Sequence, residues 1–193
     1  MIQSEKTDRT HQELLKAAQT LFLERGFDRT SIADIASLSG YSTGAFYRHY
    51  KTKSDILIEL WADFLDDFIS GSIEHTMNTG SLEEAVDVLV KRSIEYFSHP
   101  MFICYHQASI VRGLKSSPSY TPDAAKDFTS MLYRLLQREY PNGDENRLHT
   151  YACTLHATIN AYSSSETLNQ DYYFDETIIR EIILLLVKEA GAK

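Results

Sequence analysis

Apolar residues recur at three- and four-residue spacings along most of this 193-residue chain, as in amphipathic helices. The first such stripe lies within residues 7–25, and the longest lies within residues 55–80. No segment shows the strict alternation that is typical of a half-buried strand. The sequence therefore predicts an all-α fold.

Glycines and hydroxyl side chains divide the first sixty residues into short pieces. Gly26 is expected to end the first helix, and Gly40 a second helix of about two turns. Ser42 has the N-cap chemistry for a third short helix over residues 43–50. Thr52 and Asp55 have the spacing of a capping box, which opens the long helix. Further helices are expected near residues 81–99, 101–112, 122–139, 144–165 and 175–190.

Two short helices after a longer supporting helix make the helix-turn-helix plan, in which the second short helix enters the DNA major groove. On that helix Thr43 and Arg48 are expected to reach base edges, and Gly44 to let the backbone come close. The expected phosphate contacts are Tyr47, His49, Lys51 and Lys53. The alternative is an ordinary helical hairpin with solvated polar side chains.

The net charge of −8 argues against nucleic-acid binding if it is considered alone. However, residues 1–60 hold eight Lys and Arg against eight Asp and Glu, so the excess acid lies in residues 61–193. No acidic residue occurs between Asp34 and Asp55, a segment that contains Arg48, His49, Lys51 and Lys53. This local positive charge is consistent with a DNA-contacting segment.

Composition indicates which broad class of protein the chain belongs to. The chain is 43% apolar and 24% charged, as in globular proteins. Its most apolar stretch, residues 178–187, is too short to span a bilayer, and no signal peptide is expected. Cys104 and Cys153 are the two cysteines and form no CxxC motif, so a reducing compartment, the cytoplasm, is expected.

Residues 30–36 and 40–57 closely resemble the DNA-binding region of the TetR family of bacterial regulators, and the likeness extends back through Gly26 and Phe27. The resemblance implies a homodimer of subunits with about nine helices, residues 1–53 binding DNA and residues 54–193 binding a small effector and the partner. It also implies a repressor released from a palindromic operator by the effector. Tyr41 and Phe46 replace the family's usual aliphatic residues. The expected DNA-binding set is Thr30, Ser31, Tyr41, Ser42, Thr43, Gly44, Tyr47, Arg48, His49, Lys51 and Lys53.

Aromatic and polar residues of the helical body are candidates for the effector site. The alternative for most of them is a place in the core, because aromatic side chains dominate core burial. No cofactor is expected, and an apolar or aromatic effector would suit the set. The set comprises Trp61, Phe64, Phe68, Phe102, Tyr105, His106, Tyr133, Tyr151, His156 and Asn160.

The last predicted helices carry residues that bear on a metal site and on a dimer interface. His149, Cys153 and His156 share one helix face, but three ligands from one straight helix seldom close around an ion, so no metal site is expected. The excess of aliphatic residues in residues 178–186 favours a dimer interface through the last two helices.

Two rival functions remain open. An enzyme is disfavoured because no phosphate loop, nucleophile elbow or paired-carboxylate motif occurs. A helical adaptor of the same fold that binds a protein in place of DNA is the second rival, and the basic segment with Tyr47 argues against it.

Overall fold

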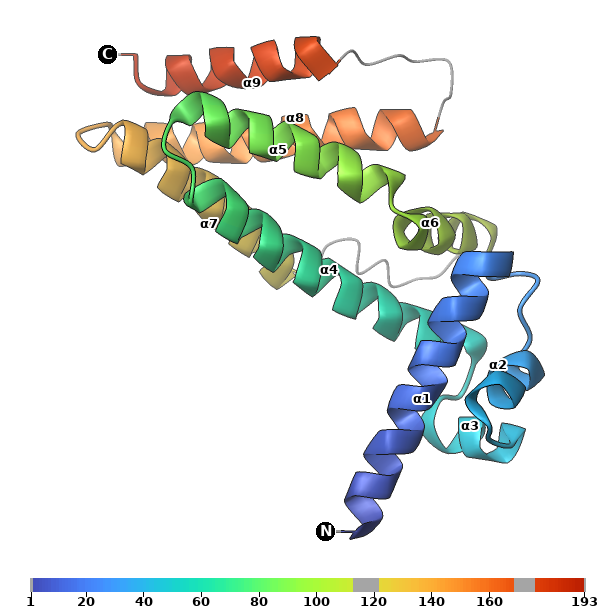
Figure 1. Ribbon diagram of the computed structural model, residues 1–193. Coiled ribbons are helices and arrows are strands. Elements are labelled where there is room, and N and C mark those ends of the chain that lie inside the picture. Colours follow the sequence, from blue (N-terminus) through green and yellow to red (C-terminus); the bar gives the residue numbers. More distant parts are fainter. Residues whose placement is uncertain (1, 113–121, 169–175, 193) are drawn as a thin grey trace. The chain divides into compact units, whose positions relative to one another are not determined.

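The computed structural model describes residues 2–112, 122–168 and 176–192, and in these ranges every regular element is an α-helix (Figure 1). The all-α prediction is therefore confirmed. Over the same ranges, no helix combines the length and apolarity needed to cross a membrane. The helices are α1 (Ile2–Arg25), α2 (Ile32–Ser39), α3 (Thr43–His49), α4 (Lys53–Met77), α5 (Leu82–Ser98), α6 (Pro100–Arg112), α7 (Pro122–Glu139), α8 (Glu145–Leu168) and α9 (Glu176–Ala190).

The expected start and stop signals define the short helices. Gly26 and Gly40 have φ angles of 82° and 74°, the left-handed region that glycine adopts without strain. The Thr52 N–H donates to the Asp55 carboxylate at 2.7 Å, and the Asp55 N–H donates to the Thr52 hydroxyl at 3.2 Å, which confirms the capping box. The first helix begins at Ile2, earlier than the apolar stripe in residues 7–25 indicates. The polar residues that precede the stripe are also helical.

The chain forms two compact units. The first contains α1, α2, α3, α4 as far as Leu65, and α6; the second contains the rest of α4 with α5, α7, α8 and α9. This division differs from the expected functional boundary after residue 53. The reason is packing, since Trp61 of α4 stacks on Tyr105 of α6 with ring centroids 4.6 Å apart.

In the first unit α2 and α3 pack beside α1 (Figure 1). Leu14, Phe22, Ile35 and Phe46 are almost completely buried there. The apolar spacing of Ile35, Ala36 and Leu38 predicts one buried face of α2, but Leu38 is 54% exposed. The core fixes α3 through Ala45 and Phe46 and leaves its other side available.

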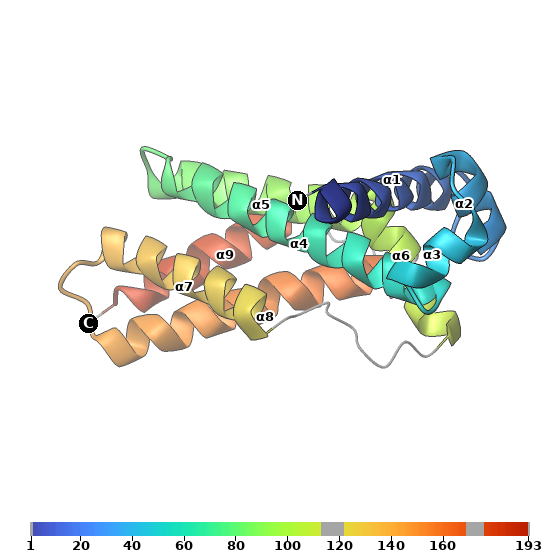
Figure 2. The same cartoon turned by 90° about the horizontal axis from the view of Figure 1, so that it is seen from below.

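The second unit has its own core, formed by α5, α7, α8 and α9, with α7 running beside α8 (Figure 2). Two polar contacts attach α9 to this unit. The Arg147 side chain donates to the carbonyls of Glu189 and Ala190 at the end of α9, and Arg180 pairs with Asp87 of α5. The exposed side of α9 is therefore held in a defined orientation within its unit.

Candidate nucleic-acid interface

Capping side chains define both helices of the helix-turn-helix. The Ser31 hydroxyl accepts from the Asp34 N–H at 3.1 Å, and the Asp34 carboxylate accepts from the Ser31 N–H at 2.8 Å. The Ser31 hydroxyl also donates to this carboxylate at 2.6 Å. The hydrogen bonds that the carboxylate accepts from the Ser31 hydroxyl and from the Ser31 N–H lower the pKa of Asp34. Ser42 caps α3 in the same way, with its hydroxyl accepting from the Ala45 N–H at 3.2 Å. Ser31 and Ser42 are thus explained by helix capping, whether or not they also contact phosphate.

The outer face of α3 presents the side chains that were predicted to read DNA. Thr43, Gly44, Tyr47 and Arg48 are all exposed, and Tyr47 retains 58% of its surface. Residues 43 and 47, and residues 44 and 48, are four apart, so the four positions form two adjacent rows on one face. The buried side of the same helix carries Ala45 and Phe46. The arrangement offers a hydroxyl, a phenol, a guanidinium and a gap at Gly44 to a groove.

The flanking predicted contacts have different surroundings. Lys51 is exposed and Tyr41 is partly buried in the turn. His49 is partly buried, and the pKa of its imidazole is lowered by burial and by the nearby His11 and Arg48. A neutral His49 would contact phosphate by a ring N–H without a charge.

Thr30 and Lys53 both take part in internal contacts. Thr30 is 2% exposed, and its hydroxyl donates to the Gly26 carbonyl at 2.9 Å, so Ser31 and not Thr30 is the cap. The Lys53 ammonium donates to the carbonyls of Phe27 and Thr30, each at 2.5 Å, and lies 4.2 Å from the centre of the Phe27 ring. Lys53 therefore ties the start of α4 to the loop between α1 and α2.

Lys51 and Lys53 make a matched pair for testing this difference. We expect Lys53→Met to lower the free energy of unfolding by about 1–3 kcal/mol, because two partly buried carbonyls lose a charged donor. The exposed Lys51→Met variant should unfold like the parent within about 0.5 kcal/mol. Urea unfolding followed by circular dichroism measures both changes. Equal stability of the two variants would contradict a structural role for Lys53.

Five of the predicted effector residues lie together in the first unit. Around Trp61, the ring centroids of Phe64, Phe102 and His106 are 5.5, 5.9 and 5.8 Å away, and Tyr105 is stacked on it. Trp61 and Tyr105 are completely buried. The set is a packed aromatic cluster, as the core alternative states, and it includes one polar ring, His106.

His106 is the polar member of this cluster. Burial lowers the pKa of His106, so its ring is neutral at neutral pH. Among the described residues, its buried Nε2 has no hydrogen-bond partner. An uncompensated buried polar atom is uncommon and often belongs to a functional site.

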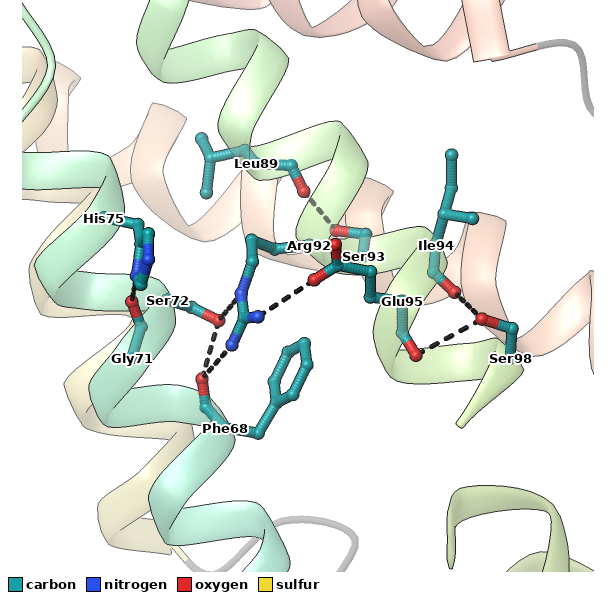
Figure 3. Close-up of polar contacts among 10 residues, drawn as sticks. All are labelled: Phe68, Gly71, Ser72, His75, Leu89, Arg92, Ser93, Ile94, Glu95 and Ser98. Carbon is teal, nitrogen blue, oxygen red and sulfur yellow. Dashed lines mark hydrogen bonds and ion pairs between the residues drawn. The ribbon is translucent and has the colours of Figure 1, made fainter. Parts of the chain in front are cut away.

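Phe68 has a different environment, in the second unit. The Arg92 guanidinium lies 4.1 Å from the centre of the Phe68 ring and donates to the Phe68 carbonyl at 3.3 Å and to the Ser72 hydroxyl at 3.2 Å (Figure 3). Arg92 also pairs with Glu95 at 2.9 Å. Phe68 therefore belongs to a contact that holds α5 against α4.

The other predicted effector residues lie on α7 and α8. Tyr133 and His156 line a surface groove of about 620 Å³ between these helices, and the Thr129 hydroxyl lies 2.6 Å from His156 Nδ1. Tyr151 lies under the Arg147 guanidinium at 5.2 Å, and Asn160 is partly buried. These residues do not form one site within their unit.

The side chains of His149, Cys153 and His156 do not converge on one point. His149 Nδ1 and Cys153 Sγ are 3.7 Å apart, but His156 is buried against Thr129. In the part of the chain that the structure describes, no group of three or more His, Cys, Asp or Glu side chains is placed to hold a metal ion.

Aliphatic side chains divide between the two sides of α9. Ile179, Ile183 and Val187 are buried in the core. Ile178 and Leu185 are exposed by 51% and 61%, and Ile182 by 37%. The apolar surface of α9 is therefore broader than its own unit covers.

Comparison with known proteins agrees with this architecture. Residues 14–60 match the model of the bacterial regulatory proteins of the tetR family. The HTH-type transcriptional repressor KstR2 of Mycolicibacterium smegmatis is 34% identical over 88 residues, 45% of this chain and 42% of that protein. The chain thus spans about two fifths of this relative's length.

Two solved structures extend the likeness over the fold. A TetR-family transcriptional regulator from Mesorhizobium loti has a TM-score of 0.69 at 14% identity, covering 95% of this chain and 96% of that one. The regulator FadR from Bacillus subtilis, solved in complex with stearoyl-CoA, has a TM-score of 0.60 at 18% identity, covering 95% and 100%. At such identities the likeness concerns the fold. The chain belongs to the TetR family of bacterial regulatory proteins.

Proposed function

We propose that this protein is a DNA-binding transcriptional repressor that places α3 in the major groove of a palindromic operator. The observation that carries the proposal is the exposed face formed by Thr43, Gly44, Tyr47 and Arg48 on a short, capped helix whose other side is buried. A repressor among the relatives with a matching DNA-binding region supports the same function. The protein acts by binding and not by catalysis, and it works in the cytoplasm.

An electrophoretic shift with DNA flanking the protein's own coding sequence tests this proposal. Binding should weaken steeply with added salt, because phosphate contacts release counterions. Absence of binding at low salt, with capture of a protein partner instead, would favour the adaptor alternative.

Residues 1–53 supply the DNA contacts, and residues 54–193 the dimer and the effector site. The dimer forms through α8 and α9, with Ile178, Ile182 and Leu185 of each copy covering those of the other. An isologous dimer relates its two copies of α3 by a twofold axis, and a palindromic operator has the matching symmetry.

The effector is an apolar or aromatic molecule that contacts the Trp61 cluster and accepts from or donates to His106. The unsatisfied Nε2 of His106 at the edge of these rings supports this assignment. The FadR relative was solved with an acyl thioester, which makes stearoyl-CoA a first probe.

Fluorescence of the single tryptophan makes the effector proposal testable. We expect a bound effector to change Trp61 emission and to lower operator affinity at the same concentrations, because one binding event shifts one equilibrium. His106→Phe should weaken both responses together. An effector that releases DNA while leaving Trp61 emission unchanged would contradict the assigned site.

A further inference from the structure

Three helices of the first unit meet at a polar cluster that lies outside the exposed face of α3. Tyr50 caps the C-terminal end of α3, and its side chain is 5% exposed. The Tyr50 hydroxyl lies 2.7 Å from Nε2 of His11 on α1. The same Nε2 lies 2.8 Å from a carboxylate oxygen of Glu59 on α4. One cluster thus connects the end of α3 to both of its supporting helices.

The rings reinforce these hydrogen bonds. His11 stacks on Tyr50 with ring centroids 5.5 Å apart and 21° between the planes. His49, the last residue of α3, lies 5.7 Å from His11 and 6.4 Å from Tyr50. The last turn of α3 is therefore held by both stacking and polar contacts.

The Tyr50 hydroxyl is not needed to fill the core. A phenylalanine ring would fill the same space between Phe46 and His11 without placing a polar atom in a buried position. Burial, and after it the Glu59 carboxylate, raise the pKa of Tyr50, so the hydroxyl keeps its proton. Tyr50 is the buried member of the cluster, whereas the side chains of His11 and Glu59 are 29% and 35% exposed. A hydroxyl in a buried position fixes the orientation of its ring, because losing its hydrogen-bond partner there costs free energy.

We propose that Tyr50, His11 and Glu59 form a positioning cluster for α3, which sets operator affinity without contacting DNA. The inference rests on the proposed DNA-binding function. The seven-residue helix α3 is held at its start by Ser42 and at its end by this cluster. Loss of the second anchor lets α3 pivot, so the side chains of its outer face no longer meet base edges together. Attraction to phosphate does not depend on that alignment.

Paired DNA measurements test the cluster. The probes are a duplex that the unmodified protein selects from random DNA and an unrelated duplex of the same length, at one salt concentration. Tyr50→Phe and His11→Phe should each lower affinity for the selected duplex about tenfold, with affinity for the unrelated duplex unchanged within about twofold. The two losses should not add in the double variant, because both substitutions remove the Tyr50–His11 hydrogen bond. His11→Gln should recover most of the loss, since its amide both accepts and donates.

Controls separate the possible outcomes. Tyr140→Phe removes a partly buried tyrosine hydroxyl of the second unit and should leave both affinities unchanged. If His11→Phe does not fold, Tyr50→Phe and Glu59→Gln answer the same question. Equal affinity of Tyr50→Phe and the parent, additive losses, or equal losses on both duplexes would each overturn the positioning role. Failure of the unmodified protein to select any duplex would instead refute the proposed function.

Discussion

Replacing Gly44 with leucine is expected to lower operator affinity about a hundredfold, at the upper end of the effect of losing a base contact. An added Cβ at Gly44 would meet only the Ser42 hydroxyl, at 3.7 Å, so the folded protein has room for a side chain. Leucine also favours the helix by up to about 1 kcal/mol relative to glycine. The loss would therefore come from the DNA, because the new side chain stands between α3 and the groove. Binding isotherms and thermal unfolding of the same preparation measure the two effects.

Gly80→Leu provides the matched control. Gly80 is also exposed, and its added Cβ would meet only a side-chain oxygen of Glu84, at 3.5 Å. This variant should bind the operator like the parent. If Gly44→Leu also bound like the parent while remaining folded, α3 could not approach DNA with that face.

Leu185→Glu is expected to dissociate the dimer and to reduce operator affinity by more than about a hundredfold, because two linked half-sites gain from effective concentration. Leu185 is 61% exposed in the single subunit and lies on the exposed side of α9 together with Ile178 and Ile182. Its carboxylate replacement costs little in the subunit but would be buried without a partner in the interface. Sedimentation at micromolar concentration should show a monomer.

Ile103→Glu is the matched control for this variant. Ile103 is a 38% exposed aliphatic residue of α6, and its replacement should leave both the dimer and DNA binding intact. A Leu185→Glu protein that still sediments as a dimer would mean that another surface holds the two copies together.

Much of the helix-turn-helix was predictable from the sequence, because its helix boundaries depend on local signals. Gly26, Gly40 and Ser42 each determine a helix boundary through backbone conformation or capping, and these effects act within a few residues. The exposed face of α3 followed from the same local pattern.

The roles of Lys53 and His11 could not be predicted, because their partners are distant in sequence. Lys53 contacts carbonyls 23 and 26 residues away, and His11 contacts a hydroxyl 39 residues away. A basic side chain in a DNA-binding motif is expected to meet phosphate, and only the tertiary structure shows carbonyls beside it. Tyr50 offered one signal, since a tyrosine on a buried helix face requires a partner for its hydroxyl.

The effector set illustrates the same limit. Trp61, Phe102 and Tyr105 converge as the aromatic pattern indicated. Phe68 instead lies under Arg92, and Tyr151 under Arg147. Apolar spacing identifies the buried side of a helix but not which neighbour covers it.

DNA recognition by α3 can be tested by selecting bound duplexes from random DNA and footprinting the selected sequences. We expect a palindromic consensus whose half-site centres lie about 10 base pairs apart, or a small multiple of that. The parent should protect its major groove, and Gly44→Leu should leave it unprotected at the same protein concentration. Recovery of no consensus, or of one that Gly44→Leu protects equally well, would contradict DNA recognition by α3.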